Sequence, residues 1–173
     1  QGVGGAMTAA GGAHRPPPRM HSRPTARADL DECFELLPPW LALDAATRAA
    51  LPGLWETLVD EPSMISGVIE DHARPPGRRI QGWGVTLALP ADMVGRLALA
   101  TDPTPYLPRR IYAALLDGSF VPMDDRAIGL ANARGDLVLM VMHFSMRSSD
   151  LSDPYVHNVL TAANDAFRHL HAG

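Results

Sequence analysis

An uninterrupted run of six apolar residues near the carboxyl end most constrains the fold of this chain. The run covers 137–142 and lies between Gly135 and a polar segment at 148–150. These flanks leave too few residues for a helix, and a short apolar run bounded by turn residues is typical of a strand covered on both faces. The sequence therefore predicts a strand at 137–144 in the middle of a sheet.

A helix is predicted after this strand. Asp153 is a suitable N-cap, and Pro154 is a suitable first helical residue. Beyond them, apolar residues recur at the spacing of one helical face: Val156, Val159, Leu160, Ala163, Phe167 and Leu170. The C-terminal third is thus expected to consist of a strand, a loop and a helix that packs back on the sheet.

The charged residues and the cysteine exclude several kinds of chemistry. All 15 basic residues are Arg, so the chain has no Lys for a Schiff base or for phosphate binding. The formal net charge of −4 predicts no nucleic-acid contact by this segment. Cys33 stands alone, which excludes an internal disulfide and a cysteine zinc cluster. No apolar run approaches the length of a membrane span, so a cytoplasmic protein without a membrane partner is expected.

The chain is expected to hold one domain behind an N-terminal arm. Residues 1–20 are mostly Gly, Ala, Pro and Arg, which bury too little apolar surface to offset their ordering entropy, so a flexible arm is expected. The domain covers 21–173 and opens with a short strand at 21–24. Asp29 and Glu32 have capping-box spacing and predict a helix. Its apolar face is formed by Leu30, Cys33, Phe34 and Leu37.

A long β-hairpin is predicted in the centre of the chain. Its strands are expected at 64–70 and 79–89, and a polar loop at 71–78 joins them. Gly82 and Gly84 interrupt the second strand, which indicates a bulge, with a close ligand contact as the alternative.

Three further helices are predicted around this hairpin. Asp44 caps the first, and Pro52 is expected either to kink it or to start a new helix. Pro108 opens the second. Asp124 caps the third, which is expected to stop near Gly135.

The order of these elements resembles the GNAT-type acyltransferases. The segment 23–33 is similar to the opening strand and first helix of that family, and 68–71 and 80–84 are similar to its second and third strands. The strand at 137–144 and the helix from Pro154 then correspond to its fourth strand and cofactor-side helix. The resemblance implies an α/β (α+β) fold with a mixed, mostly antiparallel sheet flanked by helices. Its second half is incomplete, because the sequence stops where a fifth strand is expected.

A narrower resemblance concerns bacterial transcription regulators. Residues 36–171 resemble N-terminal regions of bacterial proteins that combine a GNAT-like half with a C-terminal LuxR-type helix-turn-helix. The segments 37–39, 131–135 and 167–173 carry this resemblance. It implies a sensor or interaction domain, with a small-molecule ligand as one partner.

The GNAT resemblance also points to candidate cofactor-binding residues. In those enzymes the loop before the last helix binds the pyrophosphate of acyl-CoA through backbone N–H groups. The corresponding candidates are Ser145, Arg147, Ser148 and Ser149. The enzyme motif Arg/Gln-x-x-Gly-x-Gly/Ala falls on 147–152, which has no glycine and carries Asp150, while Asp153 follows. We therefore expect no bound cofactor and a non-catalytic domain, with an acyl-CoA-dependent N-acyltransferase as the alternative.

Histidines supply the remaining candidates. His143 lies at the carboxyl end of the predicted strand, where it is a candidate general base, with a structural, hydrogen-bonded histidine as the alternative. His169 and His171 are two residues apart on a predicted helix and point in different directions, so no metal site is expected.

The apolar strand at 137–144 also bears on partners. No later strand is predicted that could pair with its far side, and soluble proteins cover or pair such an edge. We therefore expect a homo-oligomer or a natural chain that continues past Gly173.

Overall fold

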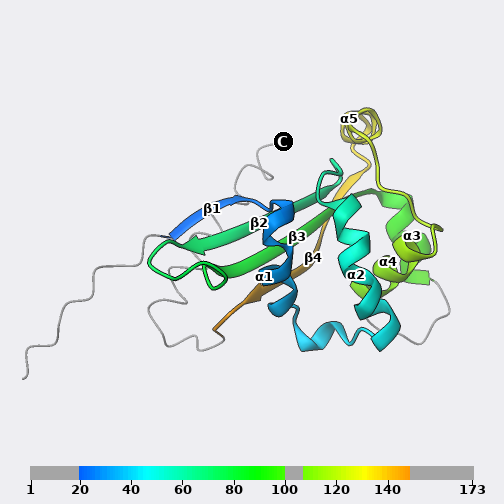
Figure 1. Ribbon diagram of the computed structural model, residues 1–173. Helices are drawn as coiled ribbons and strands as arrows, with labels where there is room; N and C mark the ends of the chain where they lie inside the picture. Colours follow the sequence, from blue (N-terminus) through cyan, green and yellow to red (C-terminus); the bar gives the residue numbers. More distant parts are fainter. Residues whose placement is uncertain (1–19, 100–106, 149–173) are drawn as a thin grey trace, which may run out of the picture.

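Four antiparallel strands and the helices around them form the fold in the computed structural model, which describes residues 20–99 and 107–148 (Figure 1). The strands, in sheet order, are β1 (Met20–Pro24), β2 (Met64–Asp71), β3 (Ile80–Pro90) and β4 (Leu137–Met146). The helices are α1 (Leu30–Glu35), α2 (Ala45–Leu58), α3 (Ala91–Leu99), α4 (Leu107–Leu116) and α5 (Asp125–Arg134). The predicted α/β fold with an antiparallel sheet and flanking helices is confirmed.

The β2–β3 hairpin forms the middle of the sheet. Every residue at 80–89 is buried. On one row across the sheet, Val68 of β2 faces Trp83 of β3, which faces Ser145 of β4. Because paired residues point to the same face, this row belongs to the side that the helices cover. The predicted hairpin is confirmed, and it sets the position of the polar side chains described below.

The prediction that the apolar strand lies in the middle of the sheet is wrong within the described residues. β4 stands at the end of the strand order, next to β3 alone. Two of its side chains, Leu139 and Val141, are 38% and 65% exposed. An apolar run indicates that a strand is partly buried, but its position in the sheet depends on its pairing partners. Here the hairpin strand β3 takes the central position.

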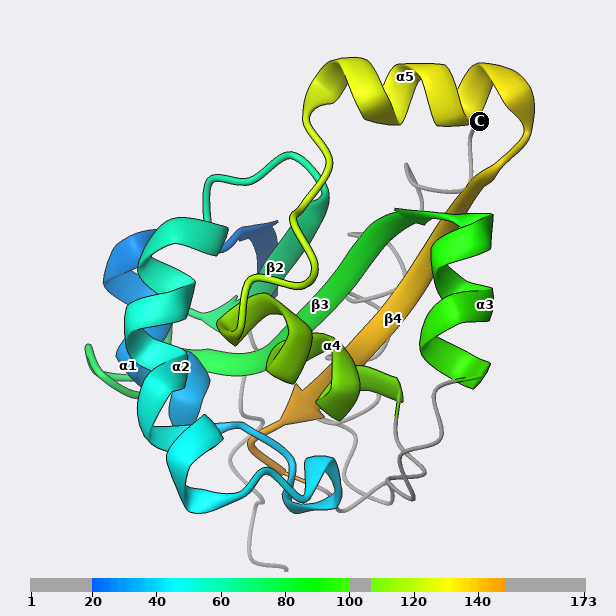
Figure 2. The same cartoon turned by 90° about the vertical axis from the view of Figure 1, so that its right-hand side faces the viewer.

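Helices α1, α2 and α4 cover one face of the sheet. Figure 2 shows α1 and α2 beside each other, α4 lying across β3 and β4, and α5 beyond the end of the sheet. The main core joins α1, α2 and α4 to β2, β3 and β4, and its largest side chains include Trp55, Trp83 and Tyr112. A small separate cluster around Ile69, with Met20, Phe144 and Met146, lies on the other face.

Local capping determines where α2 and α5 begin, as predicted. The Asp44 carboxylate accepts a hydrogen bond from the Thr47 backbone N–H at 2.8 Å, and the Asp124 carboxylate accepts one from Ala127 at 2.7 Å. Gly135 ends α5 with a φ of 70°, a left-handed conformation that favours glycine. The chain stays helical through Pro52, so the alternative of a new helix starting there is excluded.

The predicted capping box at the first helix is wrong. A short 3₁₀ turn, Arg27–Asp29, precedes α1, and Asp29 makes no side-chain cap there. Its carboxylate instead accepts hydrogen bonds from the Ala26 backbone N–H at 2.7 Å and from the Arg23 guanidinium. Glu32 accepts the backbone N–H of Ile80 at 3.0 Å. Both carboxylates therefore accept hydrogen bonds from outside the helix. Strands β1 and β3 supply these donors, through Arg23 and Ile80, and a capping pattern read from neighbouring residues cannot predict them.

Several sequence-based predictions concern residues outside the described ranges, including those for Ser149, His169 and His171. The arm at 1–20 falls there except for Met20, which is the first residue of β1. The helix predicted from Asp153 and Pro154 also lies outside the described residues.

Candidate functional site

A β-bulge in β4 determines the position of His143, the candidate general base. The pairing of β3 with β4 shifts between Val85, which faces His143, and Thr86, which faces Val141. Met142 is therefore the extra residue. Met142 and His143 are both fully buried, whereas Val141 is exposed. The bulge thus turns two consecutive side chains into the core, which an unbroken strand cannot do.

His143 lies in an aromatic and largely apolar environment. Its ring contacts Trp83 edge to face, with 4.6 Å between the ring centres, and its Nδ1 lies 3.3 Å from Ser145 Oγ. Among the described residues, its Nε2 has no hydrogen-bond partner. Burial lowers the pKa of His143 from 6.5 to about 4, so the imidazole is neutral at pH 7. With 1% of its surface exposed, it has the protonation state of a base but no contact with solvent.

Trp83 links His143 to a chain of hydroxyl groups. Its indole Nε1 donates a hydrogen bond to Ser66 Oγ at 2.9 Å, and Ser66 Oγ shares a hydrogen bond of 2.7 Å with Thr25 Oγ1. Trp55 packs against the same indole at 5.2 Å. These contacts hold Trp83 in one position, as expected for a buried polar network that fixes the core.

Arg147 follows β4 and turns its guanidinium towards α1. Its Nε donates to the Ile80 carbonyl at 3.1 Å, and its Nη1 donates to Glu35 at 3.2 Å. Its Nη2 lies 3.7 Å from a Glu32 carboxylate oxygen, so this second contact is an ion pair longer than a hydrogen bond. Two carboxylates of one helix therefore neutralise the cation that the GNAT resemblance predicts to bind a cofactor phosphate.

The other predicted cofactor-binding residues occupy different surroundings. Ser145 is buried beside His143, so the structure brings these two candidates together. Ser148 lies at the end of the described part of the chain, where it has a contact of its own. Ser149 lies outside the described residues. The four predicted residues thus do not form one described anion site, and their role in cofactor binding stays a prediction.

A second charged cluster, not predicted from the sequence, joins β1, β2 and the turn before α1. Arg23 binds both Asp29 and Glu70 through paired contacts of 2.6–3.0 Å. Hydrogen bonding to Arg23 lowers the pKa of Glu70; for Asp29, hydrogen bonds from Arg23 and Ala26 outweigh the opposing effect of burial and lower its pKa as well. Arg23 is satisfied by these partners, so the cluster stabilises the sheet edge. Its signal was absent from the sequence because the partners lie up to 47 residues apart.

Cys33 is a core residue rather than a nucleophile. It is fully buried in α1, and burial, together with the nearby carboxylates of Asp29 and Glu32, raises the pKa of its thiol. A raised thiol pKa leaves almost no thiolate at neutral pH.

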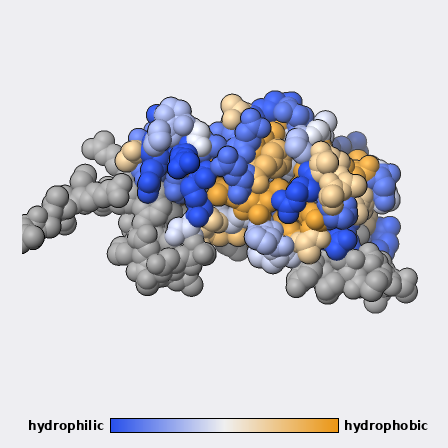
Figure 3. All heavy atoms as spheres, turned by 60° about the horizontal axis from the view of Figure 1, so that its bottom comes forward, coloured by the Kyte–Doolittle hydropathy of each residue, from blue (hydrophilic) through white to orange (hydrophobic). Residues whose placement is uncertain are grey.

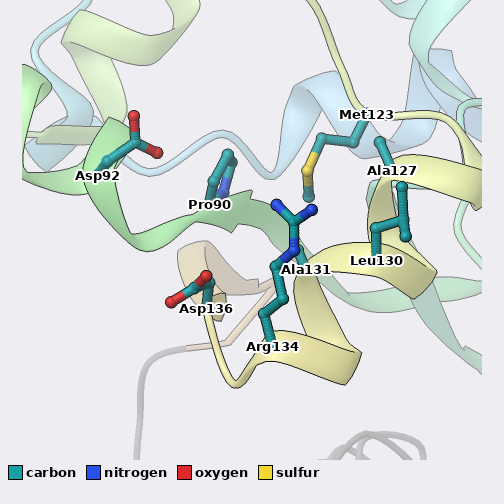
Figure 4. A pocket seen from close by; sticks show the side chains of 8 residues that line it. All are labelled: Pro90, Asp92, Met123, Ala127, Leu130, Ala131, Arg134 and Asp136. Atoms are coloured by element: carbon teal, nitrogen blue, oxygen red, sulfur yellow. The ribbon is translucent and has the colours of Figure 1, made fainter.

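An open hollow of about 420 Å³ lies beneath α5 and was not predicted. Its lining comes from α5 and the loop before it, from the junction of β3 with α3, and from the turn into β4 (Figure 4). The lining combines apolar side chains with three charged ones, Asp92, Arg134 and Asp136. No sequence motif marks it, because it exists only through the placement of α5 against the sheet.

Apolar side chains also remain on the surface. Figure 3 shows apolar surface gathered across the middle of one face, with hydrophilic surface beside it. Where the structure describes side chains, the large apolar residues that stay exposed are Trp40, Leu116, Val121, Leu130, Leu139 and Val141. Exposed apolar surface is typical of contact sites, so the predicted self-association stays open as a prediction.

Comparisons with protein families, with curated proteins and with solved structures found no match to this chain. In the part of the chain that the structure describes, no helix is long and apolar enough to cross a membrane. In the same residues, no three His, Cys, Asp or Glu side chains come together in a group that could hold a metal ion.

Proposed function

We propose that this chain is a non-catalytic GNAT-like domain that senses a small ligand for a bacterial transcription regulator. One observation carries the proposal: the guanidinium of Arg147, which the family resemblance assigns to acyl-CoA, is bound by Glu32 and Glu35. The resemblance to the N-terminal regions of LuxR-type regulators supplies the regulatory part of the proposal.

The electrostatics at Arg147 disfavour a bound pyrophosphate. A phosphate oxygen that displaces Glu35 from the guanidinium leaves two carboxylates close to a multiply charged anion. Like charges about 4 Å apart cost roughly 1 kcal/mol in water and about 4 kcal/mol near a protein surface. Arg147 alone does not offset this repulsion, because its charge is already shared with Glu32.

The proposal is also supported by the position of His143. A general base for acyl transfer must come within hydrogen-bond reach of the substrate amine, or reach it through one water. His143 is enclosed by Trp83, Ser145 and the rest of the core, and it has 1% exposure. A domain with its histidine in the core and its loop arginine neutralised is better suited to binding than to chemistry.

Thermal melting in the presence of coenzyme A and acetyl-CoA tests the proposal. A ligand at 100 times its Kd stabilises a protein by about 2.7 kcal/mol, which is a clear rise in Tm. We expect no rise at millimolar ligand for the wild-type chain. A rise in the wild type contradicts the proposal and favours the acyl-CoA-dependent N-acyltransferase.

A pair of variants shows whether the glutamates are the cause. Glu35→Gln removes one carboxylate from Arg147, whereas Asp31→Asn removes an equal charge from an exposed position of the same helix that has no contact with Arg147. Because only Glu35 of these two residues pairs with Arg147, any gain in CoA binding is expected in Glu35→Gln and not in Asp31→Asn.

A further inference from the structure

Helix α5 lies next to the sheet but is loosely packed. None of its ten residues is buried, although Leu130 is a large apolar side chain with 49% of its surface exposed. Helices of this length gain most of their stability from burying an apolar face. The hollow of about 420 Å³ lies where that face turns towards the end of the sheet.

One side of the hollow is apolar. Met123 precedes α5, Ala127 and Leu130 lie on the helix, and Pro90 closes the hollow from the end of β3 (Figure 4). A volume of about 420 Å³ is within the range of small-molecule pockets, which are mostly apolar with a few polar groups that orient the ligand.

The charged groups of the hollow are of both signs. In Figure 4 the Arg134 guanidinium extends between Met123 and Pro90, and the carboxylate of Asp136 lies below Pro90, with Arg134 between it and Leu130. Among the described residues, neither side chain forms an ion pair, whereas Asp92 is occupied by Arg96 at 2.7 Å. The backbone of Asp136 is fixed, because its N–H donates to Ala131 and its carbonyl accepts from Ala91. With respect to residues 20–99 and 107–148, the hollow therefore offers one available cation and one available anion.

We propose that this hollow binds a small apolar zwitterion of the α-amino-acid class. Arg134 binds the carboxylate of the ligand, Asp136 binds its ammonium group, and the apolar body lies against Leu130 and Met123. This inference rests on the proposed sensing function and names the class of ligand that is sensed. Phosphorylated ligands fit less well, because Asp92 and Asp136 repel a multiply charged anion.

Binding at this place couples the ligand to the position of α5. An apolar side chain in the hollow covers Leu130 and gives the helix the packing that it lacks in the free protein. A ligand that binds only the packed arrangement shifts the population towards it. Ligand binding in the hollow is then expected to protect the α5 amides from hydrogen exchange. A change in the packing of one helix is the kind of signal that a regulator can transmit.

Isothermal titration of the full 173-residue chain with L-leucine, L-methionine and L-phenylalanine tests the proposal. We expect at least one of them to bind with a Kd of about 1 mM or tighter, a modest affinity for a ligand of this size. The N-acetyl derivative of that amino acid lacks the ammonium group, and its amide lacks the carboxylate. Both are expected to bind at least about tenfold more weakly, because each leaves one charged partner unsatisfied.

Variants locate the site. Arg134→Gln and Asp136→Asn are expected to weaken binding at least about tenfold, and Arg126→Gln, which removes a charge from α5 outside the hollow, is expected to leave it unchanged. Circular dichroism spectra and melting curves of the variants verify that they fold.

Three results overturn the proposal: no binding of any of the three amino acids at about 20 mM, equal binding of the N-acetyl derivative, or equal binding by Arg134→Gln. The CoA experiment is independent, because Arg147 and Asp136 flank opposite ends of β4, about 35 Å apart along the strand. Absence of amino-acid binding without CoA binding removes only this inference, whereas CoA binding contradicts the proposed function itself.

Discussion

The two ends of β4 have opposite characters. At its carboxyl end, the bulge places Met142 and His143 in the core, and Arg147 is held by two glutamates and a backbone carbonyl. In its amino half, Leu139 and Val141 are exposed, and α5, which lies beyond this end of the sheet, has no buried residue. One strand therefore joins a well-packed region, in which the charge of Arg147 is paired, to a loosely packed region that carries the charged hollow.

The difference between the two ends shows which arginine of the two has a charge available to a ligand. Arg147 and Arg134 flank opposite ends of β4, yet of these two only Arg147 is neutralised by contacts with the described residues. The sequence resemblance directs attention to Arg147. Arg134 and Asp136, at the end of the strand where the hollow lies, form no ion pair with the described residues, so their charges are available within that part of the chain.

The largest expected contrast is in packing energy. Trp83→Ala removes a fully buried indole that contacts Phe34, Trp55 and His143, and we expect a loss of about 3–5 kcal/mol in the free energy of unfolding. Leu130→Ala in α5 is expected to change it by about 0.5 kcal/mol or less, as for a surface position. Urea denaturation with unchanged m-values measures both. Losses of similar size in the two variants contradict the contrast.

The second contrast depends on pH. As the pH falls, the unfolded chain protonates His143 near its ordinary pKa of 6.5, whereas burial delays protonation in the folded chain to about pH 4. The contribution of His143 to the free energy of unfolding is therefore constant above pH 6.5 and falls from there down to about pH 4, by on the order of 3 kcal/mol.

A variant assigns this pH dependence. His143→Gln has no group that titrates there, so the difference between its pH profile and that of the wild type isolates the histidine. If the free energies of unfolding of the wild type and of His143→Gln change in parallel between pH 6.5 and 4, His143 does not have a lowered pKa in the folded chain.

A smaller contrast separates the two arginines. Arg147→Ala leaves Glu32 and Glu35 close together without their cation and removes a donor from the Ile80 carbonyl, so we expect a loss of roughly 1 kcal/mol. Arg134→Ala removes no ion pair with the described residues and is expected to change stability by less than about 0.5 kcal/mol. A larger loss for Arg134→Ala, measured by urea denaturation, contradicts the view that its charge is available.

The parts of the fold that the sequence predicts are those determined by neighbouring residues. Asp44 and Asp124 cap helices, Gly135 ends one, and the alternation around the polar loop 71–78 gives the hairpin. Each of these features depends on hydrogen bonds or backbone angles within a few residues. Local rules therefore predict their positions nearly to the residue.

The remaining features depend on residues far apart in the sequence. Arg147 contacts Glu35 across 112 positions, and Asp29 is taken from its expected cap by Arg23 of a neighbouring strand. The position of β4 at the end of the described sheet follows from the pairing of β3, not from its own apolar run. The hollow has the same origin, since it requires α5, β3 and β4 to meet.

Site-resolved amide hydrogen exchange tests the central contrast most directly. Amides that open only with the whole protein exchange at the global free energy of unfolding, whereas poorly packed segments exchange through local opening. We predict that β4 amides at 142–146 that bond to β3 exchange near the global limit and that α5 amides exchange through openings of much lower free energy. Equal protection of α5 and of 142–146 in the free protein would contradict the account.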